Sequence, residues 1–143
     1  MMIELTIAAI IGLAFRGVVV LWAIRRDSVL VVPRKFKESE ERKVYYICAV
    51  LGAAVEEPLF RWWLVLVPMP WLILAVGVST FIWVFMHEDG WLTNLVFGAI
   101  IAIITIYFGI WAGLVTHLVY NLAGAAIVFQ RFGGVQVSRA RNH

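Results

Sequence analysis

Two adjacent carboxylates and an arginine interrupt an apolar stretch of the 143-residue chain. The segment EEPLFRWW covers residues 56–63, and VYYICAVLGAAV precedes it. Glu57 and Arg61 are four residues apart, so on a helix they share a face and can form an ion pair. Glu56 points about 100° away from Glu57 on the same helix. Because Arg61 can neutralise Glu57, we expect Glu56 to be a buried acid without a full counter-charge.

A buried glutamate of this kind is suited to general-base catalysis. Burial disfavours the charged form of a carboxyl group, so such a carboxylate readily takes a proton from water. The structural alternative is that all three charges form one interhelical polar clamp, although a clamp does not need a second acid. Pro58 removes a backbone hydrogen bond, which predicts a kink or an exposed carbonyl group close to the two acids.

Three more polar side chains lie in other apolar segments. His87 ends the run FIWVFMH, and His117 and Asn121 lie four residues apart, on one face of a helix. A lone histidine in an apolar helix is more often a packing residue than a ligand. Here, however, each side chain needs a polar partner that lipid cannot supply. We therefore expect these residues to converge with Glu56 inside a small helix bundle.

The composition places these residues in a membrane. Hydrophobic residues make up 63% of the chain, whereas soluble domains are roughly half apolar. A spanning helix needs about 20 mostly apolar residues. The predicted fold is an all-α polytopic membrane bundle of about five transmembrane helices. These helices are expected at 5–24, 44–67, 71–87, 91–108 and 110–130.

The positive charges indicate the orientation of the bundle. Ten of the twelve Lys and Arg residues lie in the loop 25–43 and in the tail from Arg131 onward. With five spans, these segments fall on the same side, which the positive-inside rule assigns to the cytoplasm. We expect a multi-pass protein of the cell membrane with its N-terminus outside. Topology explains the basic residues, so a nucleic-acid partner is not expected, and no zinc-finger or RNA-binding pattern occurs.

The polar residues together resemble the motifs of the CPBP family, which contains the type II CAAX prenyl endopeptidases and the bacteriocin-processing and immunity-associated Abi proteins. That family carries E-E-x-x-x-R, aromatic-x-x-x-His and His-x-x-x-Asn on separate membrane helices. The three motifs begin here at Glu56, Trp83 and His117, and the resemblance covers residues 44–130. The second motif usually begins with phenylalanine, and the first is usually followed by glycine, where this chain has Trp62.

The resemblance implies an intramembrane endopeptidase. In such a site Glu56 and His87 would activate a water molecule to attack a peptide carbonyl, and His117 and Asn121 would donate hydrogen bonds to the oxyanion. Glu57 and Arg61 would hold the motif helix in place. A metal-free glutamate mechanism without a cofactor is preferred. The rival arrangement is a divalent metal such as zinc, bound by Glu56, His87, His117 and a water molecule.

The same interpretation divides the chain into three parts. An N-terminal helix and basic loop at 1–43 precede a four-helix catalytic core at 44–130, and a cytoplasmic tail follows at 131–143. The expected partners are the lipid bilayer and a peptide or protein substrate presented at the membrane. The alternative function is a non-catalytic membrane protein of the same fold that binds or protects a partner.

The two histidines are expected at different depths in the membrane, which would keep them from both meeting Glu56. With straight helices, His87 would lie near the cytoplasmic end of the bundle and His117 nearer the other end. We therefore predict that the turn at 88–90 sinks into the bundle and lines a water-filled cavity, with His87 no more than about 10 Å from Glu56. Arg16 is expected to snorkel or to pair with an acid, and a role in holding a substrate carboxylate is a further option.

Small residues and the single cysteine are assigned to packing. Cys48 lies in an apolar run and can form no internal disulfide. Gly98 with Ala102, and Gly109 with Gly113, have the small-xxx-small spacing of closely packed membrane helices.

Overall fold

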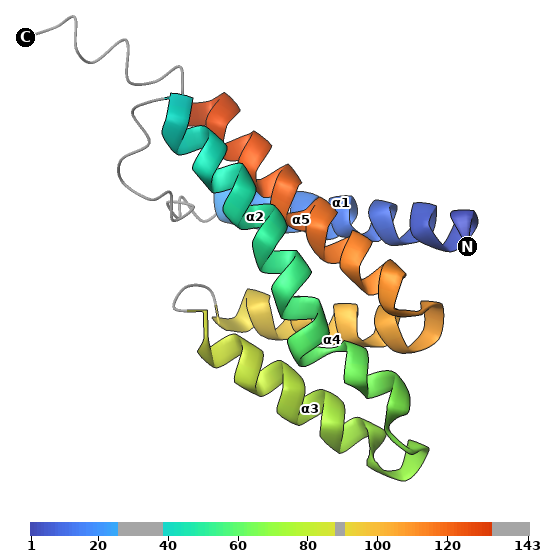
Figure 1. Cartoon of the computed structure of the whole chain (residues 1–143). Coiled ribbons are helices and arrows are strands. Elements are labelled where there is room, and N and C mark those ends of the chain that lie inside the picture. Colours follow the sequence, from blue (N-terminus) through green and yellow to red (C-terminus); the bar gives the residue numbers. More distant parts are fainter. Residues whose placement is uncertain (26–38, 88–90, 133–143) are drawn as a thin grey trace, which may run out of the picture.

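The computed structural model describes residues 1–25, 39–87 and 91–132, and in these residues it contains helices and no strand (Figure 1). The predicted all-α membrane bundle is confirmed. Its elements are α1 (Met2–Arg25), α2 (Ser39–Phe60), the 3₁₀ helix η1 (Trp62–Leu66), α3 (Met69–Phe85), α4 (Trp91–Phe108) and α5 (Ile110–Phe132).

Three helices in the described part of the chain are long and apolar enough to cross a membrane. They cover Met2–Trp22, Trp91–Phe108 and Ile110–Ile127, and α3 is a shorter apolar helix. Helix α2 differs because it carries Lys43 near its start and two glutamates near its end. Large apolar side chains on the outside, such as Ile73 and Phe85, are exposed, as a lipid environment allows. The chain is an integral membrane protein.

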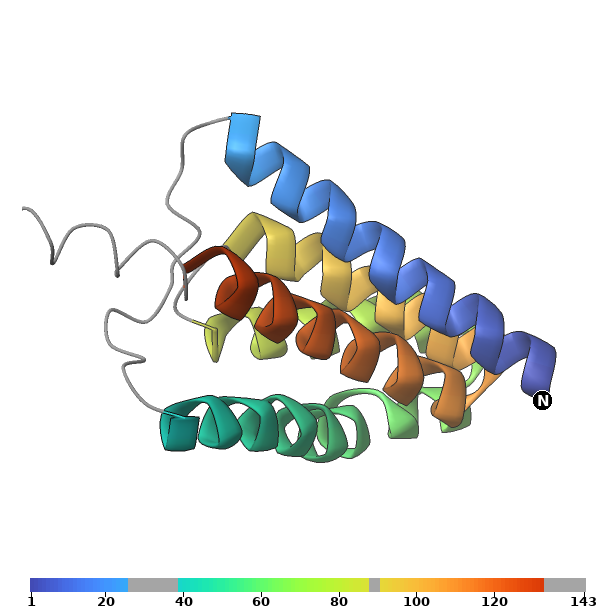
Figure 2. The same cartoon turned by 90° about the horizontal axis from the view of Figure 1, so that it is seen from above.

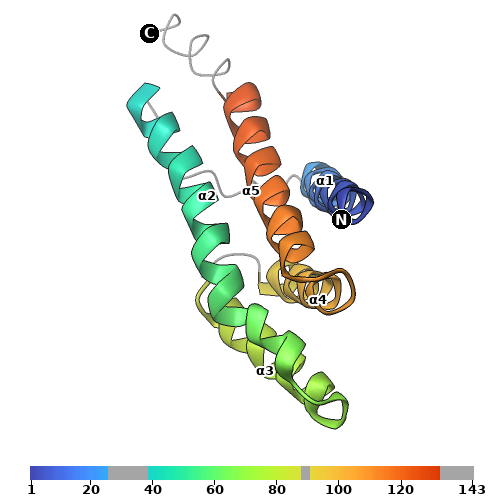
Figure 3. The same ribbon diagram turned by 45° about the vertical axis from the view of Figure 1, so that its right-hand side comes forward.

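Helix α5 occupies the centre of the bundle. It packs against α1, α2 and α4, while α3 packs mainly against α4; Figure 3 shows α5 between α2 and α1. Consecutive helices run in opposite directions. The last turns of α1, α3 and α5 and the first turns of α2 and α4 therefore gather at one end of the bundle (Figure 2). The assignment of this end to the cytoplasm remains a prediction.

The second apolar segment is not one continuous helix, as the expected span 44–67 implied. Helix α2 ends at Phe60, and Arg61 leaves the helical path with φ −130° and ψ −30° before η1 begins. Pro58 lies two residues before this end and cannot donate the backbone hydrogen bond to the Ala54 carbonyl, which weakens the helix just before it stops. Trp62 packs edge-on against Trp111 at the start of α5, with 5.8 Å between ring centroids. This contact gives a packing role to the tryptophan that replaces the usual glycine.

Two of the packing assignments need correction. Gly98 does lie in a close contact, since a Cβ atom there would fall 2.9 Å from Thr80 Cγ2 and 3.0 Å from Trp83 Cε3. Gly109 instead forms the turn between α4 and α5, with φ +90° and no atom within 4 Å of a Cβ at that position. Only glycine adopts this conformation without strain. Cys48 is exposed rather than packed in the core.

Contact between α1 and α5 depends on Gly12. A Cβ atom at this position would lie 2.6 Å from the backbone oxygen of Thr116, and the Thr116 hydroxyl donates to the Ala8 carbonyl at 3.1 Å. Because a backbone atom cannot move away like a flexible side chain, we expect Gly12→Ala to push the two helices apart. The expected cost is about 1–3 kcal/mol, the usual range for overpacking, measured by thermal unfolding in detergent micelles.

Gly17 on the same helix provides the matched control. No atom lies within 4 Å of a Cβ atom placed there. Gly17→Ala should therefore leave stability unchanged or raise it by up to about 1 kcal/mol through helix propensity. Equal melting temperatures for the two variants would show that α1 does not pack on α5 through Gly12.

Candidate functional site

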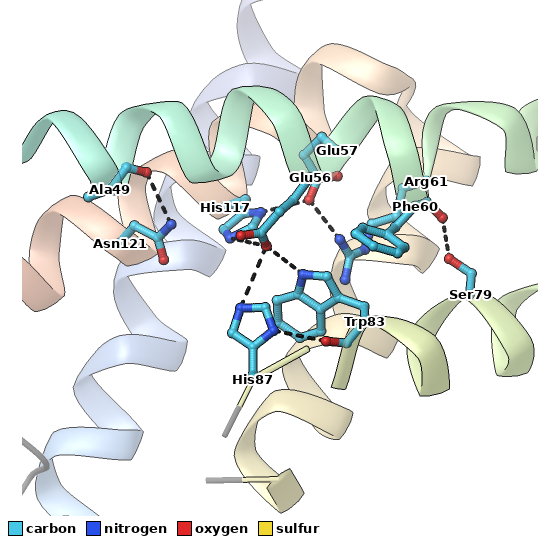
Figure 4. Close-up of polar contacts among 10 residues, drawn as sticks. All are labelled: Ala49, Glu56, Glu57, Phe60, Arg61, Ser79, Trp83, His87, His117 and Asn121. Carbon is cyan, nitrogen blue, oxygen red and sulfur yellow. Dashed lines mark hydrogen bonds and ion pairs between the residues drawn. The ribbon is translucent and has the colours of Figure 1, made fainter. Parts of the chain in front are cut away.

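Polar side chains from three helical segments meet in the interior of the bundle (Figure 4). Glu56 of α2 places Oε2 3.7 Å from Nε2 of His87, which follows α3, and 3.8 Å from Nε2 of His117 on α5. The distance from His87 is far below the 10 Å limit set from the sequence. His117 is almost fully buried, whereas the Glu56 and His87 side chains are 24% and 32% exposed. The cluster can therefore be reached from outside.

The lengths of the segments explain how His87 reaches Glu56. After Glu56 the chain continues to the end of α2 and through η1, which carries it further in the same direction. Helix α3 then returns over 17 residues, or roughly 25 Å at 1.5 Å per residue. Its last turn therefore comes back beside Glu56 and not beside the start of α2. The predicted sunken turn at 88–90 lies outside the described residues.

Glu57 is the centre of a fully buried network. Its Oε1 atom accepts hydrogen bonds from Arg61 Nη1 at 3.0 Å and from His117 Nδ1 at 2.8 Å. The predicted pairing of Glu57 with Arg61 is therefore present, and both side chains have no exposed surface. The bond to His117 was not predicted, because the sequence cannot show that α5 packs against this face of α2. It fixes the orientation of the imidazole ring.

The hydrogen bonds also constrain the orientation of His117. A carboxylate only accepts, so Nδ1 must carry a hydrogen atom, and Nε2 then faces Glu56. The two ring nitrogens of His117 therefore face the two different glutamates of the motif.

Trp83 is the site residue that sequence reasoning missed. Its indole Nε1 donates to Glu56 Oε2 at 2.5 Å, and its ring lies beneath the Arg61 guanidinium with 4.5 Å from Cζ to the centroid. The side chain is only 2% exposed. The sequence did contain a signal for this role, since tryptophan stands here in place of the family's usual phenylalanine. Tryptophan keeps the aromatic face and adds a hydrogen-bond donor.

Trp83 also orients His87 through its backbone. The carbonyl oxygen of Trp83 lies 2.8 Å from His87 Nδ1, and since a carbonyl only accepts, Nδ1 carries a hydrogen atom. Nε2 then faces Glu56 at 3.7 Å, which is too long for a direct hydrogen bond. A water molecule would fit between Nε2 and the carboxylate.

Asn121 does not join this cluster. Its Nδ2 atom donates to the backbone oxygen of Ala49 at 3.2 Å and so ties α5 to α2 one turn further along (Figure 4). Asn121 and His87 both line a cavity beside the site. The Ser79 hydroxyl donates to the carbonyl of Phe60, which joins α3 to the end of α2.

The possible metal ligands were tested by their geometry. In a tetrahedral zinc site with bonds of about 2.0–2.1 Å, neighbouring donor atoms lie roughly 3.3–3.4 Å apart. Glu56 Oε2 is 3.7 and 3.8 Å from the two Nε2 atoms, and it already accepts the indole hydrogen of Trp83. Within residues 1–25, 39–87 and 91–132, no group of three or more His, Cys, Asp or Glu is arranged to hold a metal ion. We assign no step to a metal.

Comparison with known proteins identifies the region that carries these motifs. A family model described as type II CAAX prenyl endopeptidase Rce1-like matches residues 41–123, which is more than half of the chain. The sporulation-killing factor biosynthesis protein SkfC of Bacillus subtilis (strain 168) is 30% identical over 80 residues. That alignment covers 47% of this chain and only 16% of SkfC. No solved structure matches.

The two neighbouring glutamates should differ in their effect on stability. Glu57→Gln leaves Arg61 as an uncompensated buried charge, and breaking a buried pair in this way costs about 3–5 kcal/mol. Glu56→Gln removes a charge from a side chain that is 24% exposed and should cost far less. Thermal unfolding in detergent micelles measures the difference.

The double variant Glu57→Gln with Arg61→Met serves as the control, since it removes both buried charges together. It should recover part of the stability that Glu57→Gln loses. Equal melting temperatures for Glu56→Gln and Glu57→Gln would contradict the buried network.

Proposed function

Since this chain belongs to the Rce1-like family of type II CAAX prenyl endopeptidases, we propose that it is an intramembrane endopeptidase that uses Glu56 as its general base. The single observation that carries this proposal is the position of Glu56 Oε2, within 3.8 Å of two histidine Nε2 atoms inside the bundle. Among the described residues of the site, Glu57 is bound by Arg61 and His117, which leaves Glu56 as the carboxylate available for chemistry.

In the proposed reaction a water molecule lies between Glu56 and His87. It donates one hydrogen bond to Glu56 Oε2 and one to His87 Nε2, which turns an oxygen lone pair towards the substrate. As the water oxygen attacks the peptide carbonyl carbon, Glu56 takes the proton. When the C–N bond breaks, the protonated Glu56 gives this proton to the leaving amine. The products are a carboxylic acid and an amine, and Glu56 returns to its carboxylate form.

The attack places negative charge on the former carbonyl oxygen. We propose that His117 donates to this oxyanion through a hydrogen on Nε2, because Nε2 faces the site and the bond from Nδ1 to Glu57 fixes the ring. A fixed donor in a water-poor site is worth several kcal/mol of barrier lowering, about 2.7–4 in one measured case. Asn121 remains a proposed second donor, and to act it would have to turn from Ala49 towards the substrate.

The proposed substrate is a peptide or protein presented at the membrane. The family description names a CAAX prenyl endopeptidase, and the similar SkfC is described as a sporulation-killing factor biosynthesis protein. We propose that this chain acts on such a membrane-associated tail in the cell membrane, with its N-terminus outside and its tail cytoplasmic, and that it needs no cofactor. The chain spans only 16% of SkfC, so no partner of SkfC is carried over.

The decisive variant is Glu56→Gln, which keeps the shape of the side chain but cannot accept the proton. We expect peptide cleavage to fall by about 10²–10⁴-fold, the usual contribution of a general base. The assay uses the full-length protein in vesicles with a farnesylated peptide that ends in a CAAX sequence and with its unprenylated counterpart. Product release is followed by mass spectrometry.

Three results would count against this mechanism. Cleavage by Glu56→Gln at the wild-type rate would exclude Glu56 as the base. Loss of wild-type activity in a chelator, restored by zinc, would favour the metal arrangement of Glu56, His87 and His117. Tight binding of the peptide without cleavage by the folded wild type would favour the alternative function of a protein that binds or protects its partner.

Trp83→Phe tests the hydrogen bond that positions Glu56. The variant keeps the aromatic ring beneath Arg61 but removes the indole donor. A hydrogen bond to a charged group contributes about 1.5–3 kcal/mol, so kcat should fall at least about tenfold, while KM changes little. Trp111→Phe is the matched control, because Trp111 is exposed and contacts Trp62 rather than the site. Equal kcat values for the two variants would remove Trp83 from the proposed machinery.

A further inference from the structure

A cavity of about 450 Å³ adjoins the site and shares His87 with it. Tyr45 and Cys48 of α2, Asn121 and Gly124 of α5 and Arg16 of α1 complete most of its wall. Among the described residues that line it there is no carboxylate. Arg16 is the permanently charged side chain among these lining residues. The wall therefore favours an anionic ligand.

Arg16 is held at the cavity without an acidic partner among the described side chains. Its guanidinium carbon lies 4.9 Å from the centroid of the Tyr120 ring, and its Nε atom is buried without a hydrogen-bond partner. Gly124 makes room for the group, since a Cβ atom there would lie 2.6 Å from Arg16 Cζ and Nη2. A guanidinium is always charged and carries five donors that match a carboxylate. An unpaired charge at membrane depth is costly, so a bound anion would stabilise it.

We propose that this cavity is the subsite for the terminal carboxylate of the peptide substrate and that Arg16 binds that carboxylate. This inference rests on the endopeptidase function proposed above. The carboxylate is favoured over a lipid phosphate because the cavity shares His87 with the site, so the end of a substrate that lies across Glu56 would be close to it. Asn121 uses one amide hydrogen on Ala49, and its second amide hydrogen provides a further donor.

The spacing along α5 sets the length of peptide that fits. His117, at the reacting position, and Gly124, beside the Arg16 guanidinium, are seven residues apart, which is about 10 Å on a helix. An extended peptide covers about 3.3–3.6 Å per residue. Arg16 would therefore hold the carboxylate about three residues beyond the bond that is cleaved.

Cys48 provides a direct reporter, since it lines the cavity and is the single cysteine of the chain. The rate at which a methanethiosulfonate reagent labels Cys48 is measured in the full-length Glu56→Gln protein, which binds peptide without cleaving it. The probes are one farnesylated peptide with a free C-terminal carboxylate and the same peptide with a C-terminal amide. The acid should protect Cys48 at about tenfold lower concentration than the amide.

Arg16→Gln should abolish this preference, and Arg16→Lys should keep part of it. Gly17→Ala, on the same helix and with open space for the added Cβ atom, should retain it in full. Equal protection by acid and amide, protection by neither, or a preference that survives Arg16→Gln would overturn the inference. Protection of Cys48 by vesicles of phosphatidylglycerol, with no difference between the two peptides, would assign the cavity to a lipid headgroup instead.

Cleavage by the protein with Glu56 intact separates the two proposals. If the peptide with the free carboxylate protects Cys48 but the wild type cleaves neither peptide, the proposed carboxylate subsite is supported and the proposed endopeptidase function is wrong. If both peptides are cleaved and protect equally, the function survives and the subsite fails. If both proposals hold, the ratio of kcat/KM for the peptide acid over the peptide amide falls from about ten towards one in Arg16→Gln.

Discussion

The buried bond network of Glu57 with Arg61 and His117 is the constraint on which the rest of this structure depends. Two of these side chains have no exposed surface, and His117 has almost none. In an apolar interior, a charge that loses its partner costs several kcal/mol. Glu57 must therefore keep both donors, and these come from its own helix and from α5. One carboxylate oxygen thus fixes the distance between α2 and α5 as well as the orientation of an imidazole ring.

The same network determines what Glu56 can do. Because Glu57 engages the arginine and one ring nitrogen of His117, Glu56 faces the remaining Nε2 atoms of His117 and His87. Adjacent glutamates on one helix point in different directions, so one becomes structural and the other remains available. Trp83 connects the two roles, since its ring supports Arg61 and its indole donor holds Glu56. Stability and proposed chemistry therefore share one side chain.

Much of this arrangement could be predicted from residue types and spacing. The pairing of Glu57 with Arg61 follows from the helical repeat, and the approach of His87 and His117 to Glu56 follows from the need of polar groups for partners in lipid. The bond from His117 to Glu57 and the turning of Asn121 towards Ala49 depend on how helices rotate against each other. Apolar helices carry little information about that rotation, because they are apolar on all faces. The break at Arg61 was missed because the apolar run continues through it.

Helix α1 lies outside the region that the family model matches, which begins at residue 41, yet it shapes the surroundings of the site. Gly12 allows its backbone to approach Thr116, one residue before His117. One turn further along both helices, the Arg16 guanidinium lies over the Tyr120 ring. It occupies the space that a side chain at position 124 would fill if this residue were not glycine. The close contact between α1 and α5 thus also places the positively charged Arg16 side chain at the cavity. In this chain the matched region supplies the proposed reacting groups, and the helix before it supplies the charge that would select their substrate.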